Sequence, residues 1–148
     1  MAVSLPDVNV LIALASEDHV HHDVADAWFA RNRVRGWATC PLTQLAFLRL
    51  VTQPAVVDPT ISMADARELL AENMAAADHE FWPLDYSVTD IIPEIGKRIV
   101  GHNQLTDALL LDLAIRRQGR LATFDQRVRN LLEPQSQHLA CLEILSGG

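Results

Sequence analysis

The stretch from residue 103 to residue 125, NQLTDALLLDLAIRRQGRLATFD, constrains the fold more than any other part of the chain. Its first half predicts a helix with almost no polar face in the middle, and a helix that is apolar all round is a buried one. Gly119 predicts the end of this helix, and residues 121–124 predict a short buried strand. Asp107 lies in the first turn of the helix, and Asp125 follows the strand directly. One acidic residue therefore stands at each end of a unit that must be packed inside the protein.

The rest of the chain also alternates between segments that predict strands and segments that predict helices. The predicted strands are 3–5, 36–40, 81–84, 121–124 and 142–145, and the other predicted helices are 8–15, 23–32, 42–51, 63–77, 88–100 and 125–132. Such alternation is typical of a parallel sheet covered by helices on both faces. A chain of 148 residues makes one domain, so we predict a single α/β domain over residues 1–148.

Three acidic residues are expected to meet at one edge of this sheet. Asp7 follows the first strand, Asp125 follows the fourth, and Asp107 opens the helix that leads into the fourth. Each of them alone is more simply explained as a helix cap. In open parallel sheets, however, ligands bind at the carboxyl ends of the strands, and Asp7 and Asp125 share that edge if strands one and four are neighbours. Three carboxylates so close would repel one another, so we expect a hard cation, Mg²⁺ or Mn²⁺, between them.

Six segments carry a family resemblance when they are taken in this order and spacing: LPDVNVLIAL, HVHHDVADAWF, PLTQLAFLRLVTQP, HEFWPLD, QLTDALLLDLA and RLATFDQRV. Together they span nearly the whole chain and resemble the PIN-domain ribonucleases, specifically the VapC toxins of bacterial toxin–antitoxin pairs. The resemblance implies a doubly wound parallel sheet of about five strands. It also implies that Asp7, Asp107 and Asp125 bind Mg²⁺ or Mn²⁺. Asn9 matches a polar residue that orients the first acid, and Thr123 matches the small polar residue beside the last.

The chain departs from this family at one position. The family has a T-E-x-x-F-x-R pattern in the helix after the second strand, and Gln44 stands here where the glutamate would be. No acidic residue occurs between residues 27 and 57 to replace it. Asp112 is a conceivable substitute, although it points about 140° away from Asp107 on a helix. Arg49, in the same pattern, either contacts a phosphate or pairs with an acid.

Several other groups have both a functional and a structural explanation. The histidines either bind a metal or simply start a surface helix: His19, His21 and His22. The arginines of the C-terminal half either form a phosphate-binding rim or are solvated: Arg116, Arg117, Arg120, Arg127 and Arg129. The aromatic residues either fill the core or line a groove for a partner helix: Trp28, Phe29, Trp37 and Phe47. The two cysteines, Cys40 and Cys141, fit no metal spacing and are expected to be reduced thiols.

The net charge of −7 is unusual for a protein that binds nucleic acid. Seven of the 12 basic residues, however, lie between Lys97 and Arg129, and an acidic protein also suits a basic partner. No apolar run approaches the length of a membrane span, and the N-terminus lacks a basic region before a hydrophobic one. We therefore expect a cytoplasmic protein without a membrane anchor.

The first functional hypothesis is a divalent-metal-dependent endoribonuclease, in which a metal-activated water hydrolyses an RNA phosphodiester. The resemblance implies that it is the toxin of a pair, with a cognate antitoxin protein, a homodimeric state, and a structured RNA such as tRNA or rRNA as substrate. The alternative is a catalytically weakened PIN fold that binds RNA or a partner, because Gln44 replaces the usual acid. An aspartyl-phosphate protein is a third option, but it requires a well-placed lysine and the chain has only Lys97.

Overall fold

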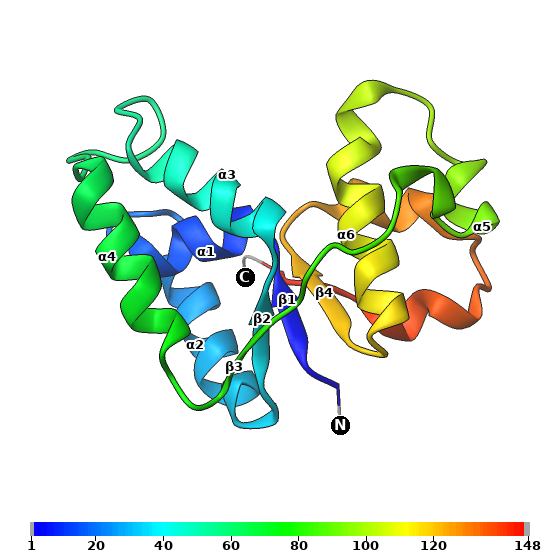
Figure 1. Cartoon of the computed structure of the whole chain (residues 1–148), viewed down its shortest axis with the longest axis horizontal. Coiled ribbons are helices and arrows are strands. Elements are labelled where there is room, and N and C mark those ends of the chain that lie inside the picture. The colour runs from blue at the N-terminus through cyan, green and yellow to red at the C-terminus, as the bar shows by residue number, and fades with distance from the viewer. Residues whose placement is uncertain (1, 147–148) are drawn as a thin grey trace.

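The computed structural model describes residues 2–146, and its centre is a five-stranded sheet in which all neighbouring strands are parallel (Figure 1). The strands are β1 (Ser4–Pro6), β2 (Trp37–Thr39), β3 (His79–Phe81), β4 (Arg120–Thr123) and β5 (Leu142–Ile144), in the order β3-β2-β1-β4-β5. The chain starts in the middle at β1, runs outward to β3, and then crosses to the other side of β1 at β4. The predicted doubly wound α/β fold is therefore confirmed, with its reversal of strand order between β1 and β4.

Helices cover both faces of the sheet (Figure 1). One side holds α1 (Val8–Ala15), α2 (His22–Asn32), α3 (Pro41–Val51) and α4 (Met63–Met74), and the other holds α5 (Pro93–Gly96) and α6 (Leu105–Arg116). Short 3-10 turns connect them: η1 (Arg33–Arg35), η2 (Val88–Asp90), η3 (His102–Gln104), η4 (Gln126–Leu131) and η5 (Gln137–Cys141). Among residues 2–146, no helix combines the length and the apolar character that crossing a membrane requires.

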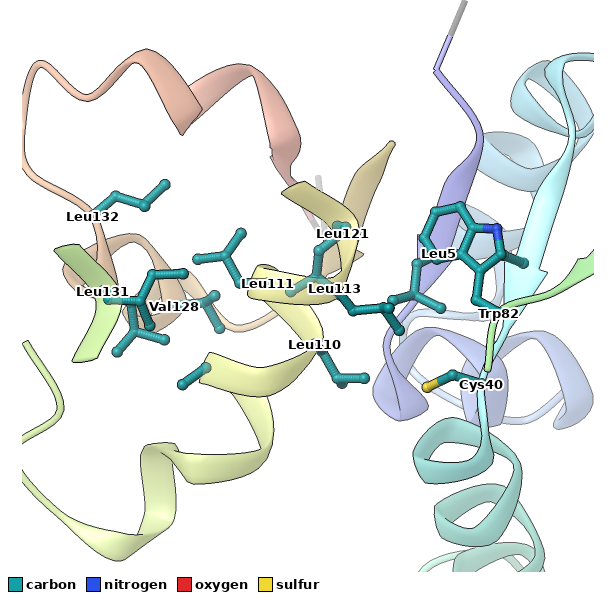
Figure 2. Packing of buried hydrophobic residues seen from close by; sticks show 14 residues of the cluster. Leu5, Cys40, Trp82, Leu110, Leu111, Leu113, Leu121, Val128, Leu131 and Leu132 are labelled. Carbon is teal, nitrogen blue, oxygen red and sulfur yellow. The ribbon is translucent and has the colours of Figure 1, made fainter. Parts of the chain in front are cut away.

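The helix α6 is buried, as its all-round apolar sequence predicts. Its residues Leu110, Leu111 and Leu113 pack with Leu5 of β1 and Leu121 of β4 in the largest core cluster (Figure 2). The next residue of β4, Ala122, points to the opposite face, because successive side chains of a strand alternate, and it joins a second cluster with α1 and α2. The β1–β4 pair is thus clamped between two apolar layers, which fixes the positions of the residues that follow both strands.

The end of α6 differs in detail from the expectation. Gln118, not Gly119, has the positive φ, of 55°. Gly119 is required for a different reason: a Cβ at this position would come within 2.5 Å of the Trp82 ring and 2.6 Å of the Val3 carbonyl oxygen. The glycine therefore lets β4 start in close contact with β1 and Trp82.

Three predicted elements are displaced or changed. The strand predicted at 81–84 lies at His79–Phe81, and its pairing ends near Trp82 because Pro83 has no N–H to donate. The helix predicted at 88–100 is instead a 3-10 turn and the one-turn α5, because Pro93 disfavours a helical conformation at the residue before it. The helix predicted at 125–132 is the 3-10 helix η4.

Candidate active site

The site lies where β1 and β4 end side by side. Ser4 pairs with Arg120 and Pro6 pairs with Ala122, so both strands reach their carboxyl ends together. The backbone N–H of Asp7 donates to the Ala122 carbonyl oxygen at 2.8 Å, which extends the pairing by one step. Asp7 and the residues that follow β4 are therefore neighbours, although more than a hundred positions separate them in the sequence.

Asp7 is buried and serves as the N-cap of α1. Its Oδ1 accepts a hydrogen bond from the Val8 N–H at 2.7 Å, and its Oδ2 accepts one from the Thr123 hydroxyl at 2.9 Å. Burial raises the pKa of Asp7 above its ordinary value; the bonds from Thr123 and Val8 oppose this rise, and the charge of Asp125 adds to it. This carboxylate is thus held in one orientation in a setting that disfavours its negative charge.

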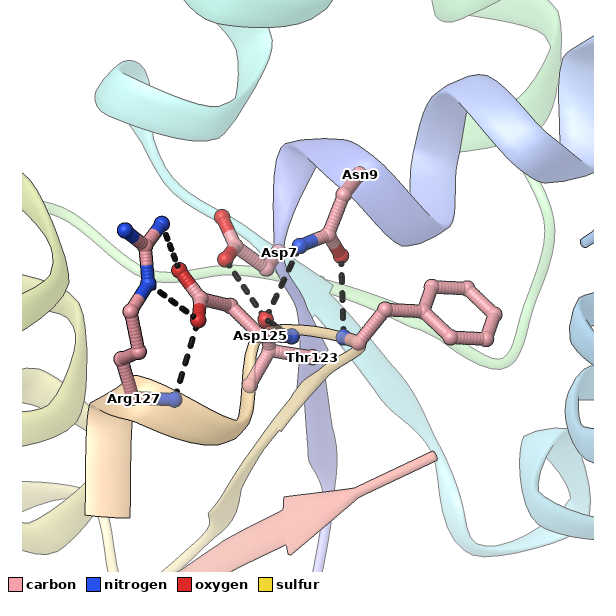
Figure 3. A network of polar contacts seen from close by, with 6 residues as sticks. Asp7, Asn9, Thr123, Asp125 and Arg127 are labelled. Carbon is pink, nitrogen blue, oxygen red and sulfur yellow. Dashed lines mark hydrogen bonds and ion pairs between the residues drawn. The ribbon is translucent and has the colours of Figure 1, made fainter. Parts of the chain in front are cut away.

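Thr123 links the acids into one network (Figure 3). Its fully buried hydroxyl donates to Asp7 and accepts from the Asn9 side-chain amide at 3.0 Å and from the Asp125 N–H at 3.1 Å. The Asn9 Oδ1 accepts in turn from the Phe124 N–H at 3.3 Å. The structure therefore places Asn9 as a support that reaches Asp7 through Thr123.

Asp125 is paired with a cation of the same chain (Figure 3). Its Oδ1 accepts from the Arg127 backbone N–H at 2.9 Å and from Nε at 3.0 Å, and its Oδ2 accepts from Nη2 at 3.0 Å. These bonds from Arg127 lower the pKa of Asp125 below its ordinary value, because the guanidinium stabilises the charged carboxylate. Asp125 is thus the acid of this group that stays ionised most readily.

Asp107 lies in the first turn of α6 and completes the group. Its pKa is raised to about 6, first by burial and then by the negative charges of Asp7 and Asp125, while Arg127 lowers it. No hydrogen bond from residues 2–146 offsets the rise. The negative charges of Asp7 and Asp125 therefore act on Asp107, and a bound cation would relieve this repulsion.

The donor set of Asp7, Asp107 and Asp125 suits a hard divalent cation, because all its atoms are carboxylate oxygens and two of the groups have raised pKa values. Across residues 2–146, however, no three His, Cys, Asp or Glu side chains are arranged to hold a metal ion as they stand. The orientation of Asp125 toward Arg127 offers a physical reason. The residues fit such a cation chemically if Asp125 exchanges its bonds to Arg127 for bonds to the cation.

The interactions of Thr123 lead to a test of the network. We expect Thr123→Val to lower the free energy of unfolding by about 1–3 kcal/mol, because the substitution leaves buried polar groups of Asp7 and Asn9 without a partner. The matched control is Thr39→Val on β2, since Thr39 is equally buried and also joins two side chains. Urea unfolding of both variants, with Mn²⁺ titration, measures the difference: both should lose stability, and Mn²⁺ affinity should fall only for Thr123→Val. Equal Mn²⁺ affinities would contradict the role given to Thr123.

Gln44 is on α3 and directs its amide away from the role expected for the family glutamate. Its Nε2 donates to the Thr39 hydroxyl at 2.9 Å, and this hydroxyl lies 2.8 Å from Nε2 of His79. Gln44 therefore belongs to a polar chain that ties α3 to β2 and β3. Its amide is engaged there and not with the three acids.

This placement reverses the result that the family pattern suggests for Gln44→Glu. A carboxylate cannot donate to Thr39, so we expect a loss of about 1 kcal/mol in stability and a change of no more than about twofold in Mn²⁺ affinity. Gln53→Glu is the control, because its exposed amide also donates locally, to the Arg49 carbonyl oxygen. Isothermal titration with Mn²⁺ and thermal melting measure both quantities. A rise of tenfold or more in affinity would show that residue 44 reaches the metal after all.

Asp112, the conceivable substitute for the missing glutamate, lies elsewhere. It is fully buried; its Oδ1 accepts from the Ile92 N–H at 2.9 Å, and its Oδ2 pairs with Arg116 Nε at 2.6 Å. The Arg116 guanidinium also stacks over the Tyr86 ring at 3.7 Å. Asp112 thus anchors the segment before α5 to α6, and the proposal that it joins the acid group is wrong for this structure.

The remaining candidates separate into structural and open groups. Arg116 and Arg120 pair with Asp112 and Glu143, whereas Arg49, Arg117 and Arg129 are exposed. Of the five arginines proposed as a rim, Arg127 is the one that contacts an acid of the site. The ion pair between Arg127 and Asp125 was not predicted from the sequence, although the D-x-R spacing after β4 is a signal for it.

The histidines and aromatic residues are mainly structural. The His22 ring lies 2.7 Å from the Ala13 carbonyl oxygen, and His19 Nδ1 accepts from the His21 N–H. Trp28 is part of the core. The other three aromatic residues line a pocket of about 390 Å³ between α1, α2, α3 and α4: Phe29, Trp37 and Phe47. Both cysteines are free thiols, as expected.

Known proteins are similar to this chain in sequence. Residues 4–133 match the family described as PIN domain. Ribonuclease VapC38 of Mycobacterium tuberculosis (strain ATCC 25618 / H37Rv) is 46% identical over 132 residues, which cover 88% of this chain and 91% of that protein. Ribonuclease VapC44 of the same strain is 43% identical over 141 residues, covering 94% of this chain and 99% of that protein. Ribonuclease VapC39 is 40% identical over 124 residues, covering 82% and 88%.

Proposed function

This chain belongs to the PIN-domain family, among the VapC-type ribonucleases, and we propose that it hydrolyses RNA with a divalent cation held by Asp7, Asp107 and Asp125. The observation that carries the proposal is that β1 and β4 end side by side at the reversal of strand order, where Thr123 bonds both Asp7 and the Asp125 N–H, and that the charges of both acids raise the pKa of Asp107. Carboxylates that repel one another do not stabilise a fold, so their presence together in a chain with ribonuclease relatives supports a catalytic role.

The side chains divide the work in this proposal. Asp7 is a rigid ligand, because Val8 and Thr123 hold both of its oxygens in place. Asp107 approaches from α6 with a carboxylate to which no residue among 2–146 donates a hydrogen bond, and Asp125 is the ligand that would exchange Arg127 for the cation. When bound, Mg²⁺ or Mn²⁺ supplies a Lewis acid that lowers the pKa of water and stabilises the negative charge on the phosphate. Thr123 and Asn9 keep the first acid aligned.

The partners follow from the same family relation and from charge. We propose that the protein is a toxin whose cognate antitoxin covers the acids with a basic segment, which its net charge of −7 favours. A structured RNA such as tRNA or rRNA would be the substrate, and the toxin would act as a homodimer. The rival is a weakened PIN fold that binds RNA without cutting it, which the placement of Gln44 on Thr39 favours.

One experiment separates these functions. The purified protein is incubated with labelled total RNA, with and without Mn²⁺ or Mg²⁺, and then with a chelator. Cleavage that requires the metal, stops with the chelator and disappears in Asp7→Asn supports the nuclease. Tight RNA binding without cleavage at any metal concentration would favour the binding module.

A further inference from the structure

Arg127 forms an ion pair with Asp125, one of the three acids of the site. Three of its N–H groups bind both oxygens of Asp125, two of them from the guanidinium at 3.0 Å each (Figure 3). The Arg127 side chain is 86% exposed, whereas that of Asp125 is 25% exposed. The pair therefore has a partly buried carboxylate, whose charge acts on Asp7 and Asp107, and a guanidinium that faces solvent.

The Arg127 guanidinium and a divalent cation would bind the same atoms, the carboxylate oxygens of Asp125. Charge-assisted bonds from a guanidinium to both oxygens of a carboxylate are strong and directional, so they hold Asp125 in its present orientation. An exposed pair of this kind contributes little to folding stability, because water solvates both partners once they separate. The bond is thus firm enough to orient Asp125 and weak enough for a cation to replace it.

Resting on the metal site proposed above, we propose that Arg127 is an internal cation that holds Asp125 while the site is empty and is displaced when a divalent ion binds. It is a positioning residue, because it acts through Asp125. Its positive charge limits the repulsion between Asp107 and the other acids before the metal arrives, and it competes with the metal afterwards. On release, the guanidinium swings into solvent without disturbing the core, and the bond from the Arg127 backbone N–H can remain.

The test is a direct measurement of Mn²⁺ affinity, by electron paramagnetic resonance of the free ion at pH 7.5. We compare the wild-type protein with Arg127→Gln, with Arg129→Gln and with Asp107→Asn. Arg129 is the matched control, because it is an exposed arginine of the same 3-10 helix. Arg127→Gln should bind Mn²⁺ roughly three- to tenfold more tightly, since a competing cation has been removed, and Arg129→Gln should stay within about twofold of wild type.

The outcomes distinguish this inference from the proposed function. If Asp107→Asn weakens Mn²⁺ binding but Arg127→Gln binds no more tightly than Arg129→Gln, the metal site stands and the inference fails. If Mn²⁺ binding does not depend on Asp107, the proposed metal site itself fails.

A second measurement needs no substitution. The NMR signal of the Arg127 Nε–H in the wild-type protein should be protected from exchange without metal and lose this protection as Mg²⁺ is added. An Nε–H signal that remains protected at saturating Mg²⁺ would overturn the inference.

Discussion

Asp107→Asn is expected to lower the rate of RNA cleavage by on the order of a hundredfold or more, and to leave the protein at least as stable as wild type at pH 7. Even the outer partners of metal ligands cost 10- to 100-fold when they are removed, so a ligand should cost at least as much. The amide keeps the size of the side chain but removes one of three charges. Its effect should therefore fall on the metal and the reaction rather than on packing.

The stability part of this prediction follows from the sign of the pKa shift. The pKa of Asp107 is about 6 in the folded protein, whereas the ordinary value for an aspartate is 3.8, so the folded state disfavours its ionised form. The loss of folding stability caused by ionised Asp107 is absent below pH 4, develops between pH 4 and pH 6, and is complete above pH 6. Removing the charge should raise the free energy of unfolding at pH 7 by on the order of 1 kcal/mol, because partial exposure reduces the full effect.

The matched control is Asp112→Asn, on the same helix. Asp112 is buried and paired with Arg116, so its loss should lower the free energy of unfolding by about 2–4 kcal/mol. Its effect on cleavage, measured per folded molecule at low temperature, should be small, because Asp112 does not face the other acids. Thermal melting and initial cleavage rates of both variants provide the comparison. A sharp fall in the melting temperature of Asp107→Asn would instead indicate that Asp107 is mainly a helix cap.

Mn²⁺ affinity should fall about tenfold for each pH unit below pH 6 and become nearly constant above pH 7. A proton and a cation compete for the Asp107 carboxylate, and its pKa of about 6 sets the pH at which the proton begins to win. The pKa of Asp7 is also raised, so the decline should become steeper than one proton at lower pH. Asp125 should add nothing in this range, because its pKa is lowered by Arg127.

Titrations of Mn²⁺ at several pH values, from pH 5 to pH 8, test this dependence. The rate of cleavage at limiting Mn²⁺ should show the same decline below pH 6. At saturating Mn²⁺ the decline should move to lower pH, since the bound cation displaces the proton. In Asp107→Asn the decline in Mn²⁺ affinity near pH 6 should disappear. An unchanged decline in this variant would mean that another titrating group controls Mn²⁺ binding.

The sequence alone determined the architecture and the location of the acids. The buried character of α6 follows from apolar residues around its whole circumference, and the parallel sheet follows from the alternation of strands and helices. Asp7 follows β1 directly and Asp125 follows β4 after one residue, and both strands end at the same edge, so their proximity is a consequence of chain order once β1 and β4 are neighbours. These features depend on periodicity and position along the chain, which a sequence displays directly.

Only the tertiary structure decided where the polar side chains of the site point. Gln44 donates to Thr39, Arg127 binds Asp125, and Asp112 binds Arg116 and the Ile92 N–H. Each choice depends on which donors and acceptors from other elements come within about 3 Å, and a rotation of one side chain changes the partner. Spacing along a chain carries no such information. The same spacing that placed three acids together therefore left open which of them is held by a cation of the protein itself.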